Sequence, residues 1–184
     1  MKTDELSSFD RGFIINWILL SVIGLVLGTT AHRFVFSLIF SLVGGGLLGK
    51  AIEGAVIGGA IGVVQMLSLP ALLKPGWGWA AGSAMGWGIG WSLGWSYGWQ
   101  LLGGFSLVYA AIGLFAGGLS GLLQWPLLRG HLSWSFMWIV ASAVGWGIGL
   151  AVGMFVRGGF GWPLAAAISS ALTGAVLYWL LSLT

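Results

Sequence analysis

The polar side chains of this chain that are best placed for a functional role are two glutamines, Gln65 and Gln124. Each lies near the end of an apolar stretch, three residues after the last of a row of glycines spaced by four. An amide inside a membrane needs partners, and a hydrogen bond between helices stabilises by about 1 kcal/mol. The glutamines therefore either bond to a neighbouring helix or loop, or line a polar constriction for a small neutral solute.

Three serines share one position in a motif that occurs three times. Tryptophan, serine and two glycines follow the spacing W-x3-S-x2-G-x3-G, and the serines are Ser21, Ser83 and Ser142. The simplest expectation is that each hydroxyl bonds back to a carbonyl of its own helix. If the glutamines line a solute path, the same serines are its next lining residues.

Residues suited to acid–base, metal or nucleophilic chemistry are few. His32 and His131 are expected at opposite membrane faces, about 30 Å apart, so one haem cannot take both. A single-histidine pigment site is the alternative to a plain interfacial histidine. Glu53 follows Lys50 by three residues, a spacing that allows a local ion pair. Since the chain has no cysteine and no acid–base pair, we predict a non-enzymatic protein without a catalytic, cofactor or metal site.

These residues must be positioned by helices, because the residues around them recur every four positions. Within residues 82–99, glycine and tryptophan both follow this spacing, which is close to the helical period and far from that of a strand. Glycine is tolerated in a membrane helix, where the backbone has no water to bond, and it lets helices approach closely. We expect packing within the chain, with some of the stripe open to a partner protein. The predicted packing glycines are Gly24, Gly28, Gly58, Gly62, Gly86, Gly90, Gly94, Gly117, Gly121, Gly145, Gly149 and Gly174.

The composition is that of a membrane protein. Hydrophobic residues make up 58% of the chain and charged residues 6%, with a mean hydropathy of +1.01. Soluble domains carry about 25% charged residues. The net charge of +3 rests on too few residues to form a basic stripe, which excludes nucleic acid as a partner. Residues 1–11 form a polar tail that lacks the basic start of a signal peptide, so we expect the first apolar helix to be retained.

The pattern predicts an all-α integral membrane protein, a six-helix bundle of three parallel-repeated transmembrane hairpins. Residues 1–184 form one membrane domain, with repeats at 13–73, 77–125 and 134–183. Because each repeat holds two helices, the repeats are related by a pseudo-threefold axis along the membrane normal. The expected spans, each near the roughly 20 residues that cross a bilayer, are 13–32, 52–73, 77–99, 105–125, 134–156 and 162–183.

The second helix of each hairpin also repeats, which aligns Gln65 with Gln124 and then with Leu177. The loss of glutamine from the third copy weakens any symmetric pore. The aligned sets are Gly54, Gly58, Gly62 and Gln65, then Gly113, Gly117, Gly121 and Gln124, then Ala166, Ser170, Gly174 and Leu177.

Residues 34–49 do not fit the repeat. They are apolar, but as a helix they rise only about 24 Å, less than the bilayer core of about 30 Å. We expect this segment to extend the first helix and then to form a short interfacial or re-entrant piece, with a seventh span as the alternative.

Four of the 13 tryptophans, at positions 87, 91, 95 and 146, lie deep in predicted spans. The simplest interpretation is that their rings fill space opposite glycines. The alternative is a flat aromatic wall for a lipophilic ligand such as a carotenoid, a chlorophyll or a quinone.

The run Gly117-Gly-Leu-Ser-Gly-Leu-Leu-Gln-Trp-Pro-Leu-Leu-Arg129 resembles uncharacterised glycine- and tryptophan-rich multispanning membrane proteins of bacteria. Those proteins carry repeated GxxxGxxQW and WxxASxxGW elements and are common in cyanobacteria and other filamentous bacteria. This chain departs from their pattern at Met66, where tryptophan is expected. The resemblance implies a bacterial membrane location and no particular activity.

Absent chemistry and abundant close-contact surface favour an accessory or scaffold subunit that packs against partners in a larger bacterial membrane complex, with a photosynthetic assembly as one setting. The alternatives are a pore or carrier for a small neutral solute and a pigment-binding membrane protein. The expected partners are the lipid bilayer and other membrane subunits. The expected location is a bacterial cytoplasmic or thylakoid membrane. A small excess of basic residues on one side favours both termini in the cytoplasm.

Overall fold

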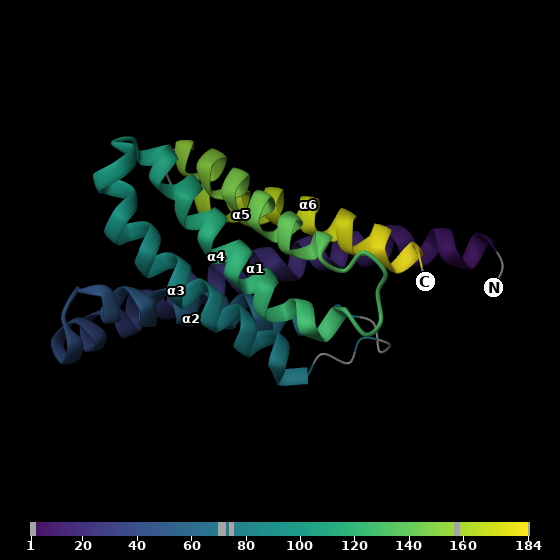
Figure 1. Ribbon diagram of the computed structural model, residues 1–184, viewed down its shortest axis with the longest axis horizontal. Coiled ribbons are helices and arrows are strands. Elements are labelled where there is room, and N and C mark those ends of the chain that lie inside the picture. The colour runs from purple at the N-terminus through teal and green to yellow at the C-terminus, as the bar shows by residue number, and fades with distance from the viewer. Residues whose placement is uncertain (1–2, 70–72, 74–75, 157–158, 184) are drawn as a thin grey trace.

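The computed structural model describes residues 3–69, 73, 76–156 and 159–183. This part of the chain is all-helical. The helices are α1 (Thr3–Val43), α2 (Leu47–Met66), α3 (Gly76–Leu102), α4 (Phe105–Leu128), α5 (Met137–Phe155) and α6 (Gly161–Ser182). Helix α1 runs close to the long axis of the molecule, and α3 and α4 run obliquely to it (Figure 1).

Five stretches within these helices are long and apolar enough to cross a membrane, as expected of an integral membrane protein. They are Gly12–Leu38, Leu47–Met66, Phe105–Leu128, Met137–Phe155 and Gly161–Ser182. Helix α3 has sufficient length, at 27 residues, but its glycines, serines and tyrosine make it less apolar than the others.

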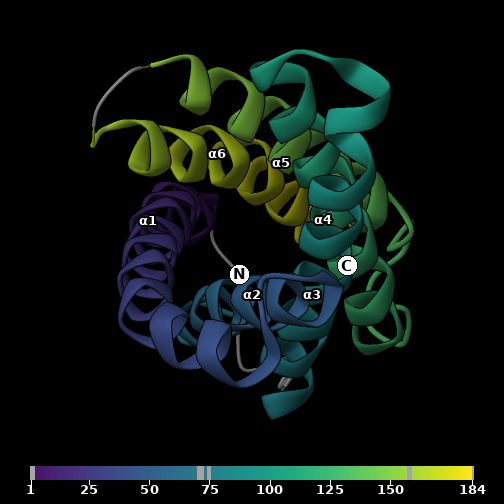
Figure 2. The same ribbon diagram turned by 90° about the vertical axis from the view of Figure 1, so that its left-hand side faces the viewer.

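The helices form a closed ring. Each packs against its neighbours in chain order, and α6 returns to pack against α1. Figure 2 looks into this ring from one end. No other pair of the described helices packs backbone to backbone, and side chains from all six helices meet in the interior.

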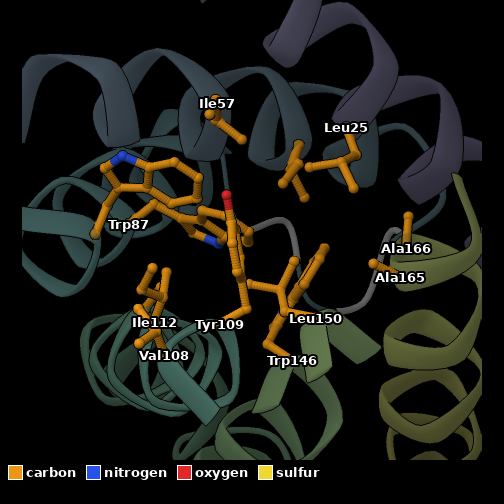
Figure 3. Packing of buried hydrophobic residues seen from close by; sticks show 13 residues of the cluster. Leu25, Ile57, Trp87, Val108, Tyr109, Ile112, Trp146, Leu150, Ala165 and Ala166 are labelled. Carbon is orange, nitrogen blue, oxygen red and sulfur yellow. The ribbon is translucent and has the colours of Figure 1, made fainter. Parts of the chain in front are cut away.

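The interior consists of two apolar clusters along the ring axis. One is centred on three tryptophans, Trp17, Trp79 and Trp138. The other, shown in Figure 3, contains Trp87 and Trp146 with aliphatic side chains from the helices other than α3. Polar side chains lie between the two clusters, because Ser21 sits one turn from Trp17 and one turn from Leu25 along α1. The polar layer is therefore enclosed on both sides.

The first hairpin differs from the prediction. Helix α1 continues to Val43, so the expectation that residues 34–49 extend the first helix is confirmed for its first part. No interfacial piece follows, because α2 already begins at Leu47. The physical reason is local: no breaker interrupts 34–43, and Gly44 with φ +73° supplies the turn. Helix α2 ends at Met66 instead of near 73, and residues 70–72 of that prediction lie outside the described residues.

The glycines allow the tight packing of the ring. A Cβ atom at Gly24 would lie 2.8 Å from Ile61 Cα, and one at Gly62 would lie 2.7 Å from Ser83 Cβ. Real Cβ atoms do not approach so closely, so each position requires glycine at the present helix spacing. All twelve predicted packing glycines face a neighbouring part of the chain in this way. A Cβ atom added at any of them would lie 3.1 Å or less from the nearest atom.

Candidate functional site

The two glutamines occupy equivalent places in the polar layer. Gln65 Nε2 donates a hydrogen bond to Ser21 Oγ at 3.0 Å, and Gln124 Nε2 donates to Ser83 Oγ at 2.8 Å. In each case an amide on the second helix of a hairpin reaches the serine on the first. All four side chains are at least nine-tenths buried. These bonds run between helices, and within the described residues neither the Ser21 nor the Ser83 hydroxyl bonds to a carbonyl of its own helix, so the expectation of a local bond is wrong for both.

Tryptophan indoles complete the coordination of the glutamines. Trp79 Nε1 donates to Gln65 Oε1 at 3.3 Å, and Trp138 Nε1 donates to Gln124 Oε1 at 3.0 Å. Each amide thus joins three helices: its own, its hairpin partner and the first helix of the next hairpin. Sequence reasoning used these tryptophans only to mark the repeat. Each of these tryptophans follows its glutamine by 14 residues in the sequence, and this repeated spacing could have indicated that the indole N–H donates to the amide.

The remaining repeat tryptophan, Trp17, closes the ring. Its Nε1 donates to Thr173 Oγ1 on α6 at 3.1 Å. The rings of Trp17, Trp79 and Trp138 lie against one another, with centroid separations of 6.2, 5.9 and 5.3 Å. We call these three residues the tryptophan triad. Because all three are buried, the triad seals one side of the polar layer.

Ser142 is the exception among the repeated serines. Its Oγ is buried and has no hydrogen-bond partner among the described residues. The position that supplies glutamine in the other hairpins holds Leu177, which is fully buried. A cavity of about 10 Å³ adjoins Ser142. It is lined by Ile61, Gln65, Ser83, Trp87, Ser120, Gln124, Trp138, Ser142, Trp146 and Thr173.

A second polar group lies toward the other end of the ring. Lys50 Nζ and Glu53 Oε2 form an ion pair at 2.9 Å, which confirms the predicted pairing. Glu53 is only 2% exposed. Helix α2 begins at Leu47, five residues before the predicted span 52–73, so Lys50 and Glu53 both lie in its first two turns.

Aromatic side chains surround this ion pair. The Lys50 Nζ lies 5.2 Å from the centroid of the Trp95 ring and 5.9 Å from that of Phe36. Trp95 continues into a set of mutually contacting rings near the ends of α3, α4 and α6. We call Trp91, Trp95, Trp99, Phe105, Tyr109 and Trp162 the end cluster.

Two indoles of the end cluster lack hydrogen-bond partners. The Nε1 atoms of Trp91 and Trp95 are buried, and neither finds an acceptor in the described part of the chain. The same holds for Nδ1 of His32. His32 was expected to close the first helix, but α1 runs on past it, so it lies inside the helix instead. His131 lies in the connection between α4 and α5, as expected.

Metal chemistry has no visible basis in the described residues, which contain no group of three histidine, cysteine, aspartate or glutamate side chains close enough to hold an ion. No protein family, curated protein or solved structure matches the chain.

Proposed function

We propose that this chain is a non-enzymatic accessory or scaffold subunit that crosses the membrane six times as three repeated hairpins and packs against other membrane proteins. The paired glutamine–serine bonds support the repeat, since two hairpins make the same contact in the same register. The start of α1 and the end of α6 lie at the same end of the ring (Figure 1), which suits an even number of spans. Helix α3, about 40 Å long, can serve as the sixth.

The observation that carries the subunit proposal is the apolar end of the first hairpin, which we call the tip (residues 34–48). Large side chains here are exposed, including Phe34 at 80% and Leu42 at 72%. A helix that enters the hydrocarbon core at Gly12 leaves it after about 20 residues, next to His32 and Arg33. The ten residues that follow in α1 rise roughly 15 Å further.

The tip therefore extends beyond the headgroup layer, which adds only about 5–8 Å on each side of the core. Basic residues at Arg33 and Lys50 stand where the hairpin crosses the interface, as basic residues at membrane surfaces commonly do. An exposed apolar patch outside the lipid is typical of a site where another protein binds. A partner subunit that covers the tip explains why these side chains remain apolar.

Site-specific crosslinking in native membranes tests the proposal. A photoreactive phenylalanine analogue at Leu42 should yield a defined product with another membrane protein, whereas the same probe at Leu19, which is also half exposed, should meet only lipid. A Phe34→Ser/Leu42→Ser variant should migrate as the lone chain after gentle extraction, while the wild type and Leu19→Ser migrate in a larger complex. A wild type that migrates alone, or a tip variant that keeps the complex, contradicts the proposal.

A second function is favoured by the end cluster. The free donors at Trp91 and Trp95 can only give hydrogen bonds, so a molecule that satisfies them must offer acceptor oxygens. Stacked aromatic faces suit a flat apolar ring. A quinone, or a pigment that carries carbonyl groups, meets both demands better than a hydrocarbon carotenoid does.

Binding of decylubiquinone to the purified chain tests this function through quenching of tryptophan fluorescence. The quenching should saturate in the wild type and weaken in Trp95→Phe, which keeps an aromatic ring but removes the indole N–H donor. Trp77→Phe, at a position 72% exposed on α3, is the matched control and should bind like the wild type. If the wild type, Trp95→Phe and Trp77→Phe all bind decylubiquinone equally well, the quinone-binding function is contradicted. The solute-path alternative gains no support, because the central cavity has room for about one water molecule.

A further inference from the structure

The cavity in the polar layer has the size and the lining of a water site. Its volume of about 10 Å³ is near the minimum that holds one water molecule. Apolar cavities of this kind stay dry, but buried water is stable where two to four polar partners converge. Six of the ten lining residues carry amide or hydroxyl groups, from Gln65, Ser83, Ser120, Gln124, Ser142 and Thr173.

At least two of these groups have unused hydrogen-bonding capacity. Ser142 is only 3% exposed, and its Oγ atom has no hydrogen-bond partner in the described structure. Ser120 Oγ donates to the Ser83 carbonyl at 3.5 Å, which is too long for a strong bond, and finds no other acceptor in the described part of the chain. The Gln124 Oε1 accepts one bond from Trp138 and can accept a second. A buried hydroxyl without a hydrogen-bond partner destabilises the folded state by about 1–3 kcal/mol, so a water molecule that bonds to it would be stabilising.

The unpaired hydroxyl follows from one substitution in the repeat. The glycines of α5 pack on α6 in the register that α3 uses on α4, since Gly149 meets Ser169 as Gly90 meets Ala116. Residue 177 therefore faces Ser142 as Gln124 faces Ser83. Leucine at 177 cannot donate to the serine, so Ser142 lacks the amide partner that Ser21 and Ser83 have.

We infer that this cavity is a binding site for one water molecule, which bonds to Ser142 Oγ and to Ser120 Oγ or Gln124 Oε1. The water gives Ser142 the hydrogen bond that Ser21 and Ser83 receive from glutamine amides, but its other partner lies on α4 and not on α6. It links α5 to α4 across the polar layer by hydrogen bonds that leucine does not provide. The site is independent of any partner subunit or ligand.

A sign test on stability examines the inference. Ser142→Ala should lower the midpoint of thermal unfolding in detergent, because it removes a partner of the bound water. If the site is dry, the same change removes an unsatisfied hydroxyl and raises the midpoint, which overturns the inference. In nuclear magnetic resonance of the chain in lipid nanodiscs, cross-relaxation from a long-lived water should reach the Trp138 indole proton, and its absence in the wild type likewise overturns the inference.

The reverse substitution tests the origin of the site. Leu177→Gln should displace the water, abolish its cross-relaxation signal and leave the unfolding midpoint near or above that of the wild type. Leu180→Gln is the matched control, because Leu180 is also fully buried on α6 but is not in register with Ser142. It should lower the midpoint sharply. If Leu177→Gln is as harmful as Leu180→Gln and the water signal persists, the assignment of the site to the missing glutamine is wrong.

Discussion

Replacement of Gln124 by leucine reproduces in the second hairpin what Leu177 already does in the third. The change removes the bonds to Ser83 Oγ at 2.8 Å and from Trp138 Nε1 at 3.0 Å. Two such bonds between membrane helices contribute about 0.6–1 kcal/mol each. The Trp138 indole is then a buried donor without an acceptor, which adds about 1 kcal/mol or more. We expect Gln124→Leu to lower the free energy of unfolding by about 2–3 kcal/mol.

Unfolding by sodium dodecyl sulfate from mixed micelles, followed by tryptophan fluorescence, measures this difference. Gln100→Leu is the matched control, since Gln100 is exposed near the end of α3 and its replacement should cost less than about 0.5 kcal/mol. Trp138→Phe combined with Gln124→Leu should cost less than the sum of the two single changes, because they remove the same bond. If Gln124→Leu costs no more than Gln100→Leu, the hydrogen-bonded layer does not stabilise the ring and the reasoning fails.

Three further predictions concern packing, charge and topology. Gly90→Leu should prevent folding, because the new side chain would overlap the α4 backbone. Gly12→Leu is the control and should extract as a folded protein, since a Cβ atom there has no neighbour within 4 Å. Normal folding of Gly90→Leu would mean that this face of α3 does not pack against α4. Glu53→Gln should lower the free energy of unfolding by about 1–3 kcal/mol by leaving its lysine partner near buried aromatics, and a midpoint equal to that of the wild type would show that the pair contributes nothing. Single cysteines at Ser7 and Ser182, in a chain with no native cysteine, should be labelled from the same side of the membrane, and labelling from opposite sides would exclude six spans.

The first helix is longer than the sequence pattern predicted. The spacing of apolar and small residues predicted a span that ended near 32, because a span needs only about 20 residues. A helix ends where the backbone is broken, and no residue before Gly44 breaks it. Bilayer thickness therefore predicts the length of a span but does not limit the helix that contains it.

The closure of the ring could not be predicted from the repeat alone. Exact symmetry would place Gly174 against Ser21, as Gly62 lies against Ser83. Instead, Gly174 packs on Trp17, one turn away, and the Trp17 indole bonds to Thr173. The closing interface between α6 and α1 joins the last repeat to the first, which no loop constrains. Its register follows from how all six helices share the space around the axis.

The sequence by itself determined the helical periods, the membrane class, the positions where glycine brings backbones together and the pairing of Lys50 with Glu53. These follow from residue spacing within single helices, where a distance of three or four positions is also a distance in space. Only the tertiary structure decided which helix each polar side chain would meet. Gln65 bonds to a tryptophan on the next hairpin, and Ser142 meets no glutamine and no other protein partner among the described residues. Such contacts depend on the mutual rotation and closure of whole helices, and no short stretch of sequence contains that information.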